Sequence, residues 1–310
     1  MPWKATGKSV IGTLHQKHNL PCQDYNGYRI LRENEIIVGS VADGAGSAKY
    51  SEHGAKVTVE TVITQITQKL EKLPNLPNSF LELLESGENQ IDLFYRTLIQ
   101  EIQEKLLEKA QQLNCSLKDL ACTLIAFIAS GEGMVALQIG DGFLVTRADE
   151  ETEYRLVFQP YKGEFTNETT FVTSTLAQET IQIKILKQKT VFICAATDGL
   201  ERVAIRFMGW QPFAPFFQPL ESFMNNYIPE VATSYVSYID SQNQTNTKNP
   251  TKFEQDIPDY EKSELKVMSN QDNQDQDENL PYLEKFLISN RLNKHTNDDK
   301  TLLLCFYQPL

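Results

Sequence analysis

Residues 35–47 read EIIVGSVADGAGS, an almost continuous apolar run that ends in an aspartate followed by small residues. Residues 35–42 have the pattern of a β-strand that is covered on both of its faces. Residues 43–47 carry too little side-chain volume to form anything except a tight loop. The segment therefore predicts a buried strand that holds the carboxylate of Asp43 at its end.

The sequence beyond this loop changes its hydrophobic period from helical to strand-like. Apolar residues recur at helical spacing over 55–70 and again over 91–113, with a break that contains Pro and Asn between them. Strand-like apolar runs then follow at 122–129, 134–139, 143–146, 154–158, 181–186, 191–196 and 301–306. The first two of these runs are joined by a hairpin sequence at 130–133. Many strands and a grouped helix pair predict an α+β fold of two packed antiparallel β-sheets flanked by helices, an αββα sandwich.

The length and composition of the chain are those of one globular unit. It has 310 residues, of which 41% are hydrophobic and 23% charged, so a sizeable core can form. We expect a single domain over residues 1–310. Residues 241–279 are rich in Asn, Gln, Asp, Lys and Glu and poor in large apolar side chains, which predicts a disordered insertion within that domain. This insertion is either regulatory or an inert surface loop.

The charge of the chain restricts its partners. A formal net charge of −12 and an isoelectric point near 4.9 argue against nucleic-acid binding and against docking on anionic membranes. Residues 1–7 lack the apolar core of a secretory signal, and the longest apolar run, 120–129, is too short to span a bilayer. Five cysteines without a Cys-x-x-Cys pair argue against a disulfide framework or a zinc site. We expect a cytoplasmic monomer.

Four aspartates stand at or beside the ends of apolar runs: Asp43, Asp141, Asp198 and Asp298, the first three followed by glycine. A strand end is a rigid platform, and a glycine lets a ligand approach the backbone closely. One Asp-Gly pair alone is ordinary turn chemistry. Carboxylates aimed from several strand ends into one place would repel each other strongly, and Mg²⁺ or Mn²⁺, which take oxygen ligands, would relieve that repulsion. The pattern therefore predicts a metal site.

Five short motifs occur in order along the chain, and together they carry a resemblance to a known family. They are Pro21-Cys22-Gln23-Asp24, Val41-Ala42-Asp43-Gly44-Ala45-Gly46-Ser47, Gly140-Asp141-Gly142, Ala196-Thr197-Asp198-Gly199-Leu200 and Asn297-Asp298-Asp299-Lys300-Thr301. The series resembles the metal-dependent serine/threonine protein phosphatases of type 2C, especially a bacterial branch of them. The resemblance runs from about residue 7 to residue 306 and omits only the middle insertion. It implies the two-sheet fold, phosphorylated protein substrates and a partner kinase in signalling.

The resemblance also implies a binuclear centre of Mn²⁺ or Mg²⁺. Asp43 matches the carboxylate that bridges both cations, and Gly44 matches the residue whose backbone carbonyl joins the second cation. Asp198 and Asp298 match the further ligands of the first cation. The implied reaction is hydrolysis of phosphoserine and phosphothreonine by a water that the metals activate, without a covalent phosphoenzyme.

Other aspartates match residues around that centre. Asp24 matches an acidic residue that holds metal-bound water, so it is both a catalytic and a metal-binding candidate. Asp141 matches a ligand of a third, weaker cation. Asp299 is expected to belong to the turn or to the surroundings of the metals rather than to the ligand set.

The chain departs from the family at three positions. Gln23 stands where many relatives carry Glu, and Ala45 stands where many carry a His that can protonate the leaving group. The Arg that contacts phosphate near the amino terminus is absent, with Asn19 near its place. These departures leave open which residues bind phosphate and which protonate the leaving group.

Basic residues just ahead of Asp24 are candidates for those two roles. His15, Lys17 and His18 either take them over, with His15 and His18 as catalytic residues, or form a solvated turn. Two other functions also stay open: a catalytically silent phosphoprotein-binding module of the same fold, and a phosphatase of small phosphate esters. The intact set of core aspartates argues against the silent module.

Overall fold

Two antiparallel β-sheets form the centre of the structure, a computed structural model that describes residues 3–31, 35–72, 88–158, 169–227 and 281–308. In spatial order, the first sheet contains β1 (Trp3–Val10), β12 (Lys300–Tyr307), β9 (Thr190–Ala196), β6 (Phe143–Ala148) and β7 (Arg155–Leu156). The second contains β2 (Tyr25–Leu31), β3 (Ile36–Ala42), β4 (Leu124–Ser130), β5 (Gly133–Ile139) and β8 (Gln182–Leu186). All of these strand pairs are antiparallel.

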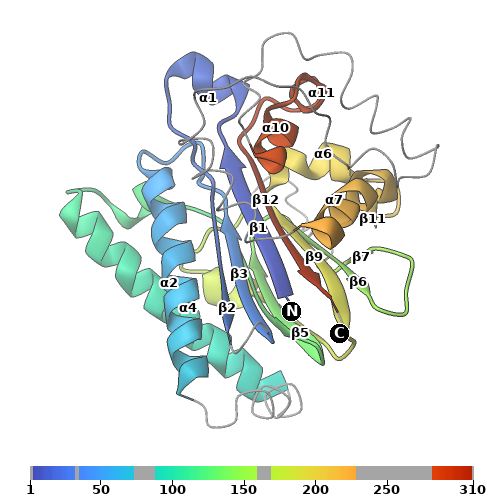
Figure 1. The fold of residues 1–310 in the computed structure, drawn as a ribbon. Helices are drawn as coiled ribbons and strands as arrows, with labels where there is room; N and C mark the ends of the chain where they lie inside the picture. The colour runs from blue at the N-terminus through green and yellow to red at the C-terminus, as the bar shows by residue number, and fades with distance from the viewer. Residues whose placement is uncertain (1–2, 32–34, 73–87, 159–168, 228–280, 309–310) are drawn as a thin grey trace, which may run out of the picture.

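Helices cover the outer face of each sheet (Figure 1). The long helices α2 (Ser51–Glu71) and α4 (Glu88–Gln112) pack on the second sheet, and α7 (Ala214–Asn226) and α10 (Tyr282–Ile288) pack on the first. The shorter elements are α1 (Thr13–His18), η1 (Leu117–Leu120), α5 (Ala177–Thr180), η2 (Asp198–Leu200), α6 (Glu201–Ala204), β10 (Ile205–Arg206), β11 (Gln211–Pro212) and α11 (Asn290–Asn293). This arrangement confirms the predicted αββα sandwich.

Strand β4 shows why the apolar runs of this chain are continuous. Every residue of β4 is buried. Leu124, Ala126 and Ile128 belong to the core beneath α2 and α4, whereas Ile125 and Phe127 belong to the core between the two sheets. Successive side chains of a strand point to opposite faces, so a strand with an apolar layer on each side needs apolar residues at every position. Each large side chain buried in this way contributes about 1.5–3 kcal/mol.

Two local structures differ from the expectations drawn from the sequence. Residues 13–18 form the helix α1. None of its residues is buried, so its sequence has no need of an apolar stripe. The strand expected over 154–158 is reduced to the two residues of β7, which pairs with β6 at the edge of the sheet. The insertion predicted over 241–279 lies outside the described residues. Among the described helices, none combines the length and apolar character needed to cross a bilayer.

Candidate metal centre

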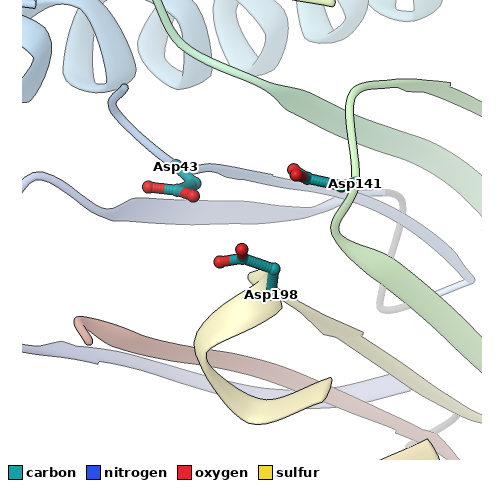
Figure 2. A group of neighbouring side chains, drawn as sticks. All are labelled: Asp43, Asp141 and Asp198. Atoms are coloured by element: carbon teal, nitrogen blue, oxygen red, sulfur yellow. The ribbon is translucent and has the colours of Figure 1, made fainter. Parts of the chain in front are cut away.

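Three of the predicted metal ligands meet at the ends of strands from both sheets. Asp43 follows β3, Asp141 lies in the turn after β5, and Asp198 begins η2 just after β9. One carboxylate oxygen from each of the three lies within 4.8 Å of the others. Figure 2 shows the three side chains pointing toward one another from separate elements. The convergence that the sequence pattern predicts is therefore present in the fold.

The strand register explains why these aspartates meet. In the second sheet, β3 pairs with β4, and Leu124 of β4 lies opposite Ile139 of β5, so the ends of β3 and β5 share one edge. In the first sheet, Phe143 lies opposite Ala196, which places the end of β9 beside the start of β6. A short turn joins β5 of the second sheet to β6 of the first, so these two strand ends lie close together. Carboxylates from both sheets therefore meet at this edge.

The backbone on both sides of the Asp43 side chain is fixed by Thr123. The backbone N–H of Asp43 donates to Thr123 Oγ1 at 3.0 Å, and the Thr123 N–H donates back to the Asp43 carbonyl at 2.8 Å. Burial, followed by the charges of Asp24 and Asp198, holds the pKa of the Asp43 carboxyl well above its usual range. The protein therefore forces a carboxylate into a place where its negative charge is costly unless a cation compensates it.

Asp198 experiences the same conflict. Burial is the first cause that raises its pKa to about 7, and the neighbouring charges of Asp141 and Asp298 add to the effect. Asp141 itself accepts a hydrogen bond from Thr169 Oγ1 at 2.7 Å through its Oδ2 atom. Charge repulsion among carboxylates with so few donors around them is the electrostatic condition under which a protein binds a divalent cation.

Asp24 lies next to this group and is almost completely buried. Thr197 Oγ1 donates to its Oδ2 atom at 2.7 Å. Its Oδ1 atom is buried and has no hydrogen-bond partner in the described part of the chain. Burial raises the pKa of Asp24 to about 7 even though the Thr197 hydrogen bond opposes that shift. A buried carboxylate oxygen without a donor fits a position that a water or a cation completes.

Asp298 and Asp299 take different positions on the turn before β12. Asp298 is exposed, and its Oδ1 atom accepts the backbone N–H of Asp299 at 2.9 Å. It lies outside the group of three aspartates, although its charge raises the pKa values of Asp43 and Asp198. Asp299 is buried, and its two oxygens accept the backbone N–H groups of Gly12 and Gln23, each at 2.6 Å. Asp299 therefore holds the amino-terminal segment against this turn.

The turn that carries Asp298 also depends on Gly199. A Cβ atom added to Gly199 would lie 1.9 Å from the Asp299 carbonyl oxygen, far inside contact distance. We expect Gly199→Ala to push the turn and Asp298 away from the other aspartates. A displacement of about 1 Å can lower turnover about 100-fold, and overpacking costs about 1–3 kcal/mol of stability. Phosphate-ester hydrolysis and a thermal melt measure the two effects.

Gly46→Ala is the matched control for that substitution. Its added Cβ would meet its nearest neighbour, Gln23 Oε1, only at 4.0 Å, which is open contact. We expect this variant to keep the activity and the melting temperature of the parent. Equal behaviour of the two alanine variants would show that the close approach at Gly199 is unimportant.

Gly44 is packed too closely to carry a side chain. Its N–H donates to the Gln23 carbonyl at 3.2 Å, and it forms an isolated β-bridge with Cys122. A Cβ atom at this position would lie 2.7 Å from Ser51 Cβ. Only glycine therefore fits here, with its backbone beside Asp43.

The two candidate histidines lie in different environments on α1. His15 Nδ1 is 3.0 Å from Asp299 Oδ2, and the His15 side chain is 12% exposed. His18 is exposed in the last turn of the helix. The structure thus brings His15, but not His18, into contact with the buried carboxylate behind the turn of Asp298.

Three threonines that hydrogen-bond to the aspartates were not predicted as site residues. Thr123 and Thr169 lie in loops far along the chain from the aspartates that they contact. No local sequence pattern therefore predicts these contacts. Thr197 precedes Asp198 directly, and its position in that motif was the one available signal. The ligand atoms of the candidate centre are carboxylate oxygens, with no sulfur or imidazole in the group of three, which suits a hard cation.

Comparison with known proteins agrees with this geometry. The sequence profile of the protein phosphatase 2C family matches residues 11–234, well over half of the chain, and ends before Asp298. Serine/threonine-protein phosphatase 3 of Escherichia coli (strain K12) is 28% identical over 223 residues, which cover 71% of this chain and 82% of that protein.

Solved structures resemble the fold at low sequence identity. A bacterial serine phosphatase superposes with a TM-score of 0.51 at 13% identity, covering 99% of this chain and 98% of that one. A sex determining protein of C. elegans gives a TM-score of 0.56 at 13% identity, with 100% of this chain and 66% of that one covered. These similarities establish the fold alone. The family profile matches well over half of the chain, and the chain brings three aspartates together at one edge of a two-sheet sandwich. We conclude that this protein belongs to the protein phosphatase 2C family.

Proposed function

We propose that this protein is a metal-dependent phosphatase that hydrolyses phosphoserine and phosphothreonine on other proteins. The observation that carries the proposal is the meeting of Asp43, Asp141 and Asp198 within 4.8 Å in a chain of this family. The Escherichia coli relative is named a serine/threonine-protein phosphatase, which supports the choice of phosphorylated serine and threonine as substrates.

The proposed metal-binding residues are those that the resemblance to the family implies. We assign Asp43 to both of two cations, Asp198 and Asp298 to the first, and the backbone of Gly44 to the second. Mn²⁺ and Mg²⁺ are the proposed ions, because an oxygen-only ligand set suits hard divalent cations. Asp141 is proposed as the ligand of a third, weaker site.

The residues around the centre have separate tasks in the proposed reaction. Divalent cations bound there supply positive charge to the phosphoryl oxygens and make the attacking water more acidic. Asp24 Oδ1, which has no donor among the described residues, would accept a hydrogen bond from that water, while Thr197 fixes the Asp24 carboxylate through its other oxygen. A carboxylate held in this way orients the water without reorganising during the reaction.

The proposed donor of a proton to the leaving group is a histidine of α1. His15 is better placed than His18, because its side chain is largely buried and its Nδ1 atom lies 3.0 Å from Asp299 Oδ2. His18 is exposed and would act only on a substrate that covers the end of the helix. Histidine is the side chain that most often acts as a general acid or base in enzymes.

Hydrolysis of matched phosphopeptides tests the proposed function. Phosphothreonine, phosphoserine and phosphotyrosine versions of one peptide, and a small aryl phosphate, are compared in Mn²⁺ with phosphate release as the readout. We expect kcat/KM for the phosphothreonine and phosphoserine peptides to exceed the value for phosphotyrosine by about tenfold or more.

Two outcomes would replace this proposal with its rivals. Hydrolysis of the aryl phosphate without hydrolysis of any peptide would indicate a phosphatase of small esters. Binding of the phosphopeptides without release of phosphate, in a folded and metal-loaded protein, would indicate the silent phosphoprotein-binding module.

A further inference from the structure

A cavity of about 500 Å³ begins at Asp198, one of the three clustered aspartates. One part of its wall is formed by Asp198 and Asp298, which belong to the candidate metal centre. Another part is formed by Arg202 of α6 and by Lys294 and His295, which follow α11. The cavity therefore continues from the place where phosphate is expected to react to a group of basic side chains.

The two cationic side chains of this cavity form no close ion pairs. Arg202 and Lys294 are exposed, and neither has a carboxylate partner within 4.0 Å in the segments that the structure describes. Apart from the two metal-centre aspartates, Glu201 is the acidic residue of the lining. The cations of the proposed metal centre would compensate Asp198 and Asp298, which leaves Glu201 against Arg202, Lys294 and a histidine in a chain with a net charge of −12.

The wall that carries Lys294 and His295 is fixed from behind. Lys300, which is almost completely buried, donates from Nζ to Asn293 Oδ1 at 2.9 Å. Asn293 in turn donates from Nδ2 to the Ile288 carbonyl at 3.1 Å. The end of α11 is therefore tied both to β12 and to the end of α10. The backbone next to Lys294 is therefore already ordered, which lowers the entropic cost of binding a ligand there.

The size of the cavity exceeds what one phosphoryl group requires. Pockets of about 300–1,000 Å³ hold ligands with many non-hydrogen atoms, so this one has room for side chains next to a phosphorylated residue. We infer that the cavity, in the phosphatase proposed above, binds an acidic side chain of the substrate adjacent to the phosphorylated serine or threonine, with Arg202 and Lys294 as its partners. The substrate class is thus phosphoproteins with Asp or Glu beside the phosphorylated residue.

Three phosphothreonine peptides, with Glu, Gln or Lys at the positions on both sides of the phosphorylated residue, test this inference. Glu and Gln are nearly isosteric, so their comparison isolates charge. We expect the wild-type protein to prefer the Glu peptide over the Gln peptide about five- to tenfold in kcat/KM at low salt, as two partly exposed ion pairs would give. The preference should shrink as salt is raised, because such pairs are screened.

The charge-reversal variant Arg202→Glu/Lys294→Glu should lose this preference and favour the Lys peptide. Arg29→Glu/Lys187→Glu is the matched control, because it changes the net charge equally at two exposed sites away from the cavity. The control should keep the wild-type order of the three peptides. Circular dichroism checks folding, and Arg202→Gln/Lys294→Gln replaces the reversal variant if that variant does not fold.

The result separates this inference from the proposed function on which it rests. The wild-type protein could hydrolyse the peptides while the cavity variant and the control variant both keep the wild-type order of preference. In that case the cavity does not bind acidic side chains, and only the inference is overturned. If the wild-type protein releases phosphate from none of the peptides, the proposed function and the inference are both overturned.

Discussion

Removal of divalent cations with EDTA is expected to lower phosphate-ester hydrolysis about 1,000-fold or more, and addition of Mn²⁺ or Mg²⁺ is expected to restore it. Charge stabilisation by a metal is worth several kcal/mol in the transition state, and each 1.36 kcal/mol is tenfold in rate. The structure supplies the reason for the dependence. The carboxylates of Asp43, Asp141 and Asp198 face one another with little else to compensate their charge.

Thermal melting gives an independent readout of the same binding. A cation at 100 times its dissociation constant stabilises the folded state by about 2.7 kcal/mol. For a chain of 310 residues that corresponds to a rise in melting temperature of roughly 4 °C. Full activity after chelation, together with a melting temperature that Mn²⁺ and Mg²⁺ leave unchanged, would contradict the metal centre.

Asp43→Asn is expected to reduce turnover about 1,000-fold at ordinary metal concentrations. Asp43 faces both Asp141 and Asp198, and it is the residue that we assign to both cations. The amide keeps the shape of the side chain but removes the charge that holds the metals, so the loss reflects electrostatics rather than packing. Hydrolysis of an aryl phosphate over a series of Mn²⁺ concentrations measures the effect.

The same substitution should act differently on the stability of the metal-free protein. Burial and neighbouring carboxylates disfavour the charged form of Asp43, so its replacement by a neutral amide should preserve or raise the melting temperature in EDTA. The increase that Mn²⁺ gives to the wild-type protein should disappear. Asp149→Asn, at an exposed aspartate paired with Lys189, is the control and should retain both activity and the metal-dependent increase. Near wild-type turnover of Asp43→Asn would refute the assignment.

The layers of the fold could be predicted because the apolar pattern of each strand depends on which of its faces are buried. In β4, the alternation of residues between two apolar cores makes every position apolar, and the sequence displays that directly. The strand order could not be predicted in the same way. β12 lies between β1 and β9 although it comes last in the chain, and this depends on contacts between residues nearly 300 positions apart.

The aspartates of the candidate site were predictable, whereas the residues that orient them were not. Each Asp-Gly pair at a strand end is visible within a few residues of sequence. The hydrogen bond between Thr123 and Asp43 depends on the register between separate strands, and Asp299 contacts His15 across almost the full length of the chain. Helix α1 escaped prediction for another reason, since a short polar helix without buried residues has no hydrophobic period to detect.

The position of β12 between β1 and β9 determines when the first sheet can be completed during synthesis on the ribosome. Chains emerge with the amino terminus first, so all preceding strands leave the exit tunnel before residues 298–307. Until then the first sheet lacks an interior strand, and Gly12 and Gln23 lack the Asp299 carboxylate that receives their N–H groups. A nascent chain therefore completes the first sheet, and anchors its amino-terminal segment through Asp299, only after residues 298–307 have been released.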